Sequence, residues 1–403
     1  MLKPAHPDDD TTRRLRVTVV QPSLAAYRQP VYRELAKRPG IDLRVRYGSS
    51  PRIPNVEPDG FQAEPAPITR IPVGRRRLMW QPAQLREASL RFSDVVVYSW
   101  DAQYLTLPPA LLRARKAGVG TVLWGHGYSK ASVAWRDALR TRLGRLADCL
   151  LFYNQSAAQH HIDLGFPDDR VFVAPNSLDQ APIQAARERW LSDPDRLTAF
   201  RREHDLIDRP VILFVSRLDA NNGLDLLLSA VDRLRSRHPR LAVVVVGKGE
   251  SEQSRLTSLA DKLGLDETVR FAGAIYEEDQ LAPYFLAADV FCYPQNIGLS
   301  LLHAFGYGLP VVTSDRMESQ NPEIEALEDG VNGRLYRHGD ADALAQTLND
   351  LLTDAEQARR VGGAGHDAVD RRYNLKAMVD GMEAAIRRAV LASSSSEQVS
   401  SPI

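Results

Sequence analysis

The chain has 403 residues, more than one ordinary hydrophobic core accommodates, so we expect two domains. Hydrophobic residues make up 44% of it and charged residues 25%, which fits a globular enzyme and argues against a disordered or fibrous protein. The formal net charge of zero hides an asymmetry, because residues 1–185 carry +9 and the remainder −9. A basic first half fits an anionic partner: a phosphorylated acceptor, a membrane surface or a nucleic acid.

Two features predict where the protein resides. The cysteines, Cys149 and Cys292, both lie in apolar runs without metal or disulfide spacing, as expected for buried thiols in a reducing compartment. The polar first residues lack the apolar core of a signal peptide, and aliphatic runs such as 241–246 are too short to span a bilayer. We therefore expect a cytoplasmic protein.

Short apolar runs alternate with helix-period stretches along the chain. In the first half we expect strands at 16–21, 42–47, 94–99, 121–124, 149–153 and 171–174, and helices at 30–37 and 108–116. In the second half we expect strands at 211–215, 242–247, 269–271, 290–293 and 310–313, and helices at 223–235, 251–263, 344–352 and 355–372. This βαβ rhythm predicts an α/β fold whose parallel sheets are covered by helices.

The domain organisation follows from the same pattern. We expect two Rossmann-like domains, at 15–182 and 210–374, whose parallel sheets face an interdomain cleft. A charged stretch at 183–209 with helical pieces and no strand reads as the linker. The last expected helix, at 375–392, is a candidate for packing back onto the first domain. The ends, 1–14 and the Ser-rich 393–403, read as disordered.

The densest basic cluster, Arg75, Arg76 and Arg77, stands next to the apolar and aromatic residues 78–80, ending in Trp80. Basic side chains beside an indole suggest contact with an anionic membrane surface. A solvated arginine-rich loop explains the cluster equally well. The basic residues are not interleaved with a recognisable nucleic-acid-binding module, so no nucleic-acid partner is expected.

The segment 293–315, YPQNIGLSLLHAFGYGLPVVTSD, is the most informative of the chain. A strand ends at Pro294, a polar loop follows, and a helix-period stretch from Leu299 to Tyr307 precedes the next strand. A glycine-containing loop between a strand and a helix places backbone N–H groups where an anionic ligand such as a nucleotide diphosphate binds.

An ordered series of motifs over residues 211–336 resembles the retaining family 4 glycosyltransferases (glycosyl transferases group 1) of the GT-B fold. The series contains VSRL at 215–218, VGKG at 246–249, FAG at 271–273, PE at 322–323 and DGVNG at 329–333. WGHG at 124–127 and PNSLD at 175–179 add to it, as in some bacterial members. Ordered matches over this length are far more specific than a lone glycine motif.

The resemblance implies roles for several residues of the second half. Arg217 and Lys248, with the backbone of Gly298 and Leu299, would bind the donor diphosphate. A guanidinium after a strand end can also clamp a diphosphate by its own chemistry. Gly247 and Ile275 would lie near the nucleoside. The alternative to diphosphate binding is a surface salt bridge for Arg217. For Lys248 it is a position in a solvated loop.

Three positions depart from the family pattern. Two motif glutamates, one near the sugar hydroxyls and one on the ribose, are replaced by Gln295 and His303. An amide and an imidazole can still bind hydroxyls, although neither supplies a negative charge. A packed histidine on a half-buried helix is the alternative for His303. The family usually has a lysine directly before the glycine at position 223, and in this chain that residue is Asn222. A cation beside the diphosphate is therefore lost.

Further candidates come from both halves. His126 lies between two glycines at a strand end, and the resemblance implies contact with the donor sugar; a turn histidine is the alternative. Glu323 is a candidate for orienting sugar hydroxyls or a loop. Tyr27, Arg28 and Asp101 follow strands and are candidates for contacting the acceptor.

Together these features predict a metal-independent, retaining glycosyltransferase without a cofactor. Its partners would be a nucleotide diphosphate sugar and a saccharide or lipid-linked acceptor of bacterial cell-surface polysaccharide synthesis, with the enzyme cytoplasmic or peripheral on the inner face of the membrane. Two alternatives stay open. One is a non-catalytic homologue that binds nucleotide sugars, suggested by the three substitutions, and the other is a sugar-nucleotide epimerase of the same fold.

Overall fold

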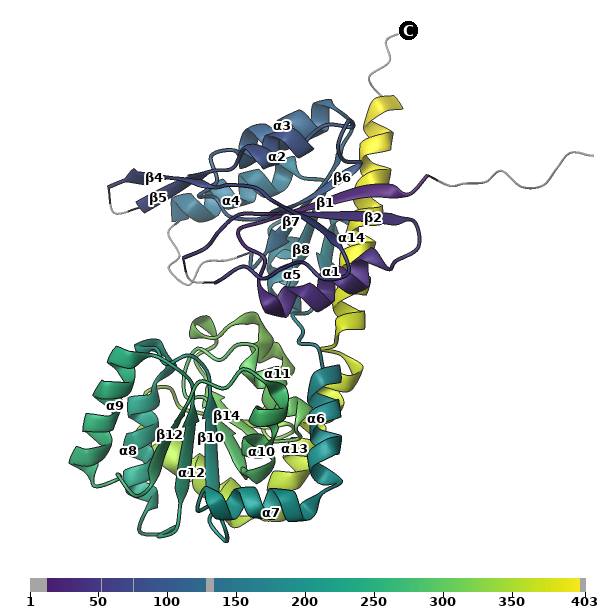
Figure 1. Cartoon of the computed structure of the whole chain (residues 1–403). Helices are drawn as coiled ribbons and strands as arrows, with labels where there is room; N and C mark the ends of the chain where they lie inside the picture. Colours follow the sequence, from purple (N-terminus) through teal and green to yellow (C-terminus); the bar gives the residue numbers. More distant parts are fainter. Residues whose placement is uncertain (1–12, 52, 75, 128–133, 399–403) are drawn as a thin grey trace, which may run out of the picture. The chain divides into compact units, whose positions relative to one another are not determined.

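The computed structural model describes residues 13–51, 53–74, 76–127 and 134–398. The chain forms two compact units (Figure 1). Unit 1 contains the residues up to Ala174 together with those from Val379 onward, and unit 2 contains Pro175–Met378. The disorder expected at residues 1–12 and 399–403 concerns positions outside the described residues.

Unit 1 is built on a parallel sheet with the strand order β3-β2-β1-β6-β7-β8-β9 among its described residues. The strands are β1 (Leu15–Gln21), β2 (Ile41–Tyr47), β3 (Gln62–Pro65), β6 (Val95–Ser99), β7 (Gly120–Gly125), β8 (Cys149–Phe152) and β9 (Val171–Val173). Their central members are fully buried, as their continuous aliphatic runs predict. The direction of winding reverses between β1 and β6, which makes this the switch point of the sheet.

The helices of unit 1 cover both faces of that sheet. They are α1 (Gln29–Ala36), α2 (Pro82–Glu87), α3 (Leu107–Lys116), α4 (Ala134–Leu146), α5 (Gln155–Asp163) and most of α14 (Leu375–Gln398). Helix α3 lies beside α2 and α4 and shares an apolar cluster with α5, whereas α1 packs on β2. Helix α14 contacts β7 and β9 through Gly120 and Val173, and Arg38, just after α1, pairs with Asp380 at 2.6 Å.

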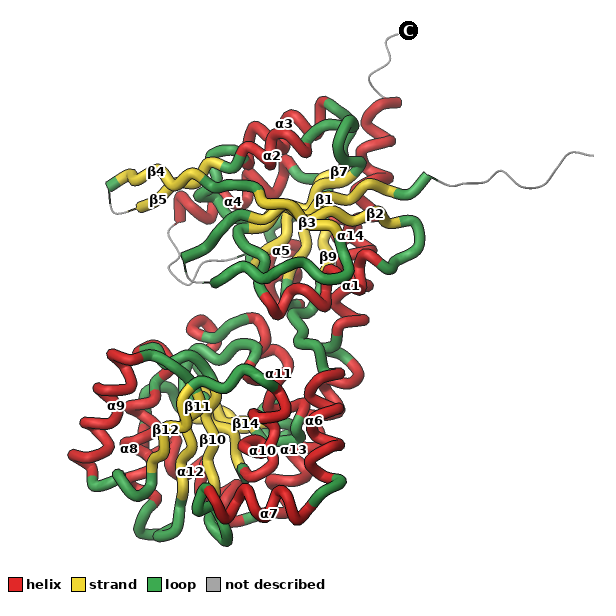
Figure 2. Tube along the Cα trace, viewed as in Figure 1, coloured by secondary structure: helices red, strands yellow, loops and turns green. Residues whose placement is uncertain are grey.

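Unit 2 repeats this architecture with the strand order β12-β11-β10-β13-β14-β15. Figure 2 shows helices of this unit lying around its strands. Its described strands, again all parallel, are β10 (Val211–Val215), β11 (Ala242–Val246), β12 (Val269–Gly273), β13 (Val290–Cys292), β14 (Val311–Ser314) and β15 (Gly333–Tyr336). The order reverses between β10 and β13, where the second switch point lies. The expected α/β fold with parallel, Rossmann-like sheets is confirmed.

The helices of unit 2 pack in two sets. On one side α8 (Leu224–Leu234) lies beside α9 (Glu250–Leu263) and α12 (Ala341–Thr353). In the other set, α10 (Glu278–Ala287) contacts α6 (Ala181–Leu191) and α7 (Pro194–Glu203), and α11 (Ser300–Gly306) contacts α13 (Ala355–Arg371). The helical pieces of the expected linker, 183–209, are thus α6 and α7, which pack within unit 2.

Two sequence expectations are corrected. The arginine cluster is not in a loop, because Arg76 and Arg77 belong to β5 (Arg76–Trp80), which pairs antiparallel with β4 (Thr69–Val73); Arg75 lies outside the described residues. An arginine-rich segment can form a β-hairpin, because the backbone hydrogen bonds across a short turn do not depend on the charge of the side chains. The last helix extends beyond its expected end at residue 392, because α14 continues to Gln398 and the Ser393 hydroxyl donates to the Val390 carbonyl at 2.9 Å. No helix in the described part of the chain is long and apolar enough to cross a membrane.

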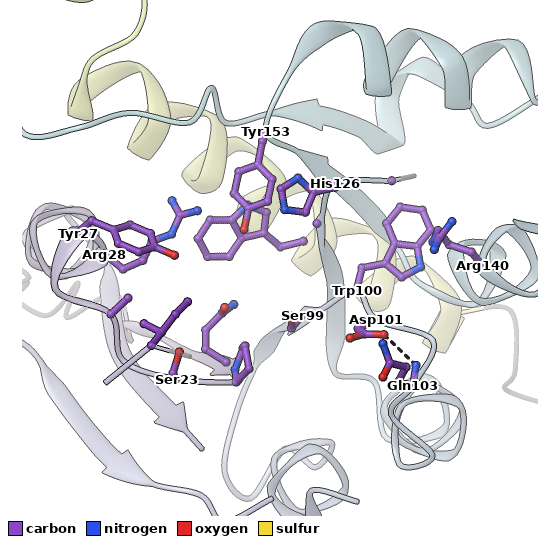
Figure 3. Close-up of a pocket in the computed structure, with 17 residues that line it drawn as sticks. Ser23, Tyr27, Arg28, Ser99, Trp100, Asp101, Gln103, His126, Arg140 and Tyr153 are labelled. Carbon is purple, nitrogen blue, oxygen red and sulfur yellow. Dashed lines mark hydrogen bonds between the residues drawn. The ribbon is translucent and has the colours of Figure 1, made fainter. Parts of the chain in front are cut away.

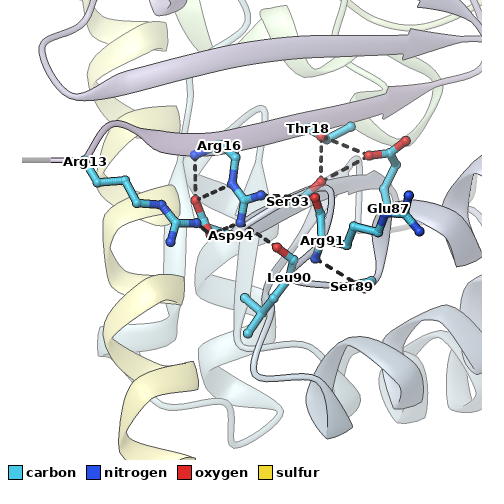
Figure 4. A network of polar contacts seen from close by, with 9 residues as sticks. All are labelled: Arg13, Arg16, Thr18, Glu87, Ser89, Leu90, Arg91, Ser93 and Asp94. Carbon is cyan, nitrogen blue, oxygen red and sulfur yellow. Dashed lines mark hydrogen bonds and ion pairs between the residues drawn. The ribbon is translucent and has the colours of Figure 1, made fainter.

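A polar network fixes the start of β1 to the segment before β6 (Figure 4). Asp94 accepts hydrogen bonds from the backbone N of Arg16 at 2.9 Å and from its Nη2 at 2.7 Å. Burial acts to raise the pKa of Asp94, but these bonds outweigh it and hold the pKa below its usual value. Deeper in the unit, the fully buried Glu87 accepts from Arg46 Nε at 3.0 Å and from Ser93. A buried pair of this kind is costly to break, since removing one partner leaves the other charge uncompensated.

The contact between α14 and β9 gives a test of how closely the C-terminal helix packs. A Cβ at Gly381 would overlap the carbonyl oxygen of Val173, whereas one at Gly363 of α13 would meet nothing within 4 Å. We expect Gly381→Ala to lower the free energy of unfolding by about 1–3 kcal/mol, because the helix must move off the sheet. Gly363→Ala, the matched control, should be neutral or stabilise by up to about 1 kcal/mol. Chemical denaturation measures both, and equal stabilities of the two variants would contradict the tight contact.

Candidate active site

Unit 1 has a cavity of about 370 Å³ at the switch point of its sheet. Its walls come from segments that follow strands: 21–28 after β1, 99–103 after β6, 124–127 at the end of β7, and Tyr153 after β8 (Figure 3). The carboxyl ends of parallel strands are where α/β sheets bind their ligands. Tyr27, Arg28, Asp101 and His126, which the sequence indicated separately, all line this one cavity.

Arg28 is buried among aromatic rings at one side of the cavity. Its guanidinium carbon lies 4.9 Å from the ring centre of Trp124, 5.0 Å from that of Tyr153 and 5.2 Å from that of Tyr27. Only 9% of the residue is exposed. Attraction between the cation and the ring faces helps to hold the side chain in place. The cavity therefore combines a fixed positive charge with ring surfaces on which a sugar can stack.

His126 lies at the rim of the cavity, with its ring centre 4.8 Å from that of Tyr153 (Figure 3). The next residue, Gly127, has a φ of +71°, and a Cβ there would lie 2.5 Å from the Phe152 ring. Glycine is required on both counts, and this turn directs the exposed imidazole away from the core. Arg140 of α4 also lines the cavity and donates to Asp137 at 2.8 Å.

Asp101 follows β6 and is half-buried in the wall of the cavity, where its Oδ1 accepts from the backbone N of Gln103 at 2.9 Å. Burial raises the pKa of the Asp101 carboxyl, although the bond from Gln103 and the charge of Arg140 act in the other direction. A carboxyl group held in a cavity with a raised pKa is a common feature of functional sites.

In unit 2, the loop that carries Arg217 is fixed by its backbone to the loop after β11. Ser216 N donates to Val246 O at 3.0 Å, and Leu218 N donates to Lys248 O at 3.0 Å. A Cβ at Gly247 would overlap the carbonyl oxygen of Ser216. The glycines of this motif thus allow close approach of two backbones, and they position the exposed Arg217.

The same loop is tied to the one after β13. Asn222 donates from its side chain to the carbonyl of Arg217 at 2.7 Å, and its own carbonyl accepts from Gln295 N at 3.1 Å. Gly223 has a φ of +74°, and a Cβ there would lie 2.9 Å from Gln295 Cγ. Asn222, at the position where the resemblance implies a lysine, is therefore buried and joins two loops at the switch point. The structure brings Arg217, Asn222 and Gln295 together.

His303 lies on α11 and faces α10. Its Nε2 is 2.9 Å from Glu278 Oε1, and the hydroxyl of Tyr307 donates to the same oxygen at 2.5 Å. The imidazole also stacks on Phe285, with ring centres 4.6 Å apart. Burial acts to raise the pKa of Glu278, but the hydrogen bonds of His303 and Tyr307 prevail and hold it below its usual value.

Other predicted residues occupy a range of positions within unit 2. Glu323 is buried and accepts a hydrogen bond from Asn176. Lys248 is exposed and lies 3.9 Å from Glu250. Gly298 and Leu299 precede α11, and Ile275 follows β12 and packs against the apolar core.

Sequence reasoning missed Tyr153 and Glu278. Tyr153 follows β8 directly, so the rule that ligand residues follow parallel strands could have found it. Glu278 gave no comparable signal, since it stands in a run of acidic residues at the start of a helix.

Comparison with protein families gives two matches. The model described as "Glycosyl transferases group 1" matches residues 195–367, and that described as "Glycosyltransferase Family 4" matches residues 31–181. The two matches cover unit 2 and unit 1 respectively for most of their lengths.

Individual relatives agree with these matches. The chain is 32% identical to the GDP-mannose-dependent alpha-(1-6)-phosphatidylinositol monomannoside mannosyltransferase of Mycolicibacterium smegmatis, over 65% of this chain and 70% of the relative. It is 26% identical to a lipopolysaccharide core biosynthesis glycosyltransferase of Rhizobium meliloti, over 79% and 88%. Among solved structures, Anabaena HepE in complex with UDP is similar in fold, with a TM-score of 0.70, 17% identity, and coverage of 92% and 98%.

The raised pKa of Asp101 predicts a pH-dependent cost in stability. An acid whose pKa is higher in the folded than in the unfolded state destabilises the fold as pH rises from the ordinary value of 3.8 through the folded value. Asp101→Asn removes the charge and keeps an acceptor for Gln103. We expect the variant to be more stable than the wild type at pH 7, with a difference that shrinks toward pH 4. Denaturation curves across this range measure it, and a constant difference would contradict the interpretation.

Proposed function

Since the chain belongs to the glycosyl transferases group 1 family and has the GT-B fold, we propose that it transfers a hexose from a nucleoside diphosphate donor to a hydroxyl of a saccharide or lipid-linked acceptor. The relatives supply the first substrates to test. The Mycolicibacterium enzyme is named for GDP-mannose and a phosphatidylinositol mannoside, and HepE was crystallised with UDP. We further propose a role in bacterial cell-surface polysaccharide synthesis, in agreement with the Rhizobium relative.

Two loops are joined at the switch point of unit 2, and this observation supports placing the nucleotide donor there. Asn222 connects the backbone of Arg217 to that of Gln295 through bonds of 2.7 and 3.1 Å. Such a junction presents a guanidinium and an amide side chain at the edge where Rossmann-like sheets bind nucleotides. A guanidinium fits two phosphate oxygens at once, and the amide can bind a sugar hydroxyl.

Transfer of the sugar requires few protein groups beyond the guanidinium and the amide. The bond from the anomeric carbon to the phosphate oxygen breaks, and a bond to the acceptor oxygen forms on the same face of the sugar. The acceptor proton passes to the departing diphosphate, so no protein base is needed and the configuration is retained. Arg217, assisted by Lys248, would stabilise the charge that develops on the diphosphate. On this basis we propose transfer without a metal or a cofactor.

The cavity of unit 1 supports a place for the acceptor. Its buried Arg28 suits an anionic group such as a phosphate, while the aromatic rings around it suit a sugar. Arg77, exposed, and Trp80, 40% exposed, both on β5, would favour contact with an anionic membrane surface on the cytoplasmic side.

Replacing Arg217 tests the donor site. We expect Arg217→Ala to raise the Kd for GDP or UDP at least about tenfold, because hydrogen bonds to a charged group contribute roughly 1.5–3 kcal/mol. Arg233→Ala, which removes an exposed arginine of α8 paired with Asp342, is the matched control and should change the Kd by less than about twofold. Calorimetry measures both. Wild-type protein that binds neither nucleotide would overturn the proposed function.

Replacing His126 tests the transfer step. With nucleotide sugars and membrane extracts as substrates, we expect His126→Ala to lower kcat by about 100-fold while leaving the Kd for the nucleotide unchanged, as for loss of a group that stabilises the transition state of the transfer. His160→Ala, at an exposed position of α5, is the control. Wild-type binding without transfer would favour the non-catalytic homologue, and product from donor alone would favour an epimerase.

A further inference from the structure

Glu278 is a carboxylate that the motif-based site does not use. It is the first residue of α10, which begins five residues after β12 ends, so it lies at the carboxyl edge of the unit 2 sheet. Its side chain keeps 23% of its surface exposed, and that of His303 keeps 16%. The group is therefore partly open to solvent at the edge that we assign to the donor.

The two oxygens of this carboxylate differ in their surroundings. Oε1 lies 2.9 Å from His303 Nε2 and accepts from the Tyr307 hydroxyl at 2.5 Å. No described residue donates a hydrogen bond to Oε2. Phe285 supports the arrangement, since its ring stacks on both His303 and Tyr307 with centres 4.6 and 4.7 Å away. One oxygen thus fixes the orientation of the group, and the other keeps its acceptor capacity.

A fixed carboxylate oxygen at this edge of a Rossmann-like sheet suits one kind of ligand group. A ribose offers hydroxyl donors, and an acidic residue near the carboxyl edge is the usual acceptor for them in nucleotide-binding sheets. The low pKa of Glu278 keeps it ionised at neutral pH, so the group accepts and does not donate. The imidazole of His303 is already directed at Oε1.

We propose that Glu278 binds a ribose hydroxyl of the nucleotide through Oε2, and that His303 and Tyr307 act as positioning residues that hold its carboxylate. This inference rests on the proposed function, because it presupposes a ribonucleoside diphosphate at the switch point of unit 2. Glu278 on the neighbouring helix α10 would then supply the negative charge that His303 does not supply.

The test compares ribose with deoxyribose in the intact chain. Calorimetry gives the Kd of GDP and UDP and of their 2′-deoxy and 3′-deoxy forms. We expect the wild type to prefer the ribonucleotide at least about tenfold over one deoxy form, as for loss of a hydrogen bond to a charged acceptor. Glu278→Gln should bind the ribonucleotide as weakly as the wild type binds that deoxy form, and should lose the preference. Tyr307→Phe should retain part of it.

Glu277→Gln is the matched control, because it makes the same change one residue away at an exposed position, and it should behave as the wild type. Thermal denaturation of each variant accompanies the titrations. A Glu278→Gln protein that keeps the ribose preference, or that loses affinity for ribose and deoxyribose forms equally, overturns this inference and leaves the proposed function in place. A wild type that binds none of the nucleotides overturns both.

Discussion

The structure depends on one constraint, which is that all described strands in the large sheet of each unit run in the same direction. After each strand the chain must return along a face of the sheet, so the loops that follow the strands all lie at one edge. Each unit then changes its direction of winding once, between β1 and β6 and between β10 and β13. At these two places the loops diverge, and side chains that are far apart in sequence come together.

The two units place different groups at this common position. In unit 1 the switch point is a cavity in which aromatic rings surround a buried guanidinium. In unit 2 the loops are joined backbone to backbone, and the glycines of the 246–249 motif make that junction sterically allowed. These glycines therefore fix the loop that carries the cation of Arg217. Asn222 acts similarly, as a buried link between the loops that follow β10 and β13.

Much of the fold could be predicted from the sequence, because buried parallel strands are continuous aliphatic runs. The segments 211–215 and 242–247 illustrate this, and the observed β10 and β11 differ from them by at most one residue. The pattern failed for β3, β4, β5 and β15, which are short or largely exposed, so burial does not impose a continuous aliphatic run on them. At the site, residues in the loops that follow strands, including Arg28, Asp101 and Arg217, were indicated by the sequence. The bond between His303 and Glu278 was not, because it depends on how α10 and α11 pack against each other.

The position of α14 has a consequence for biosynthesis. Unit 2 is continuous in sequence, whereas unit 1 is completed by residues from Val379 onward, which contact Val173 and Gly120. A ribosome therefore releases the last piece of unit 1 only after all of unit 2 has been made. The nascent sheet of unit 1 must remain without this helix during that interval, with the surface that α14 later covers open to chaperones. The second unit in the sequence is thus the first for which all residues of its own core are available.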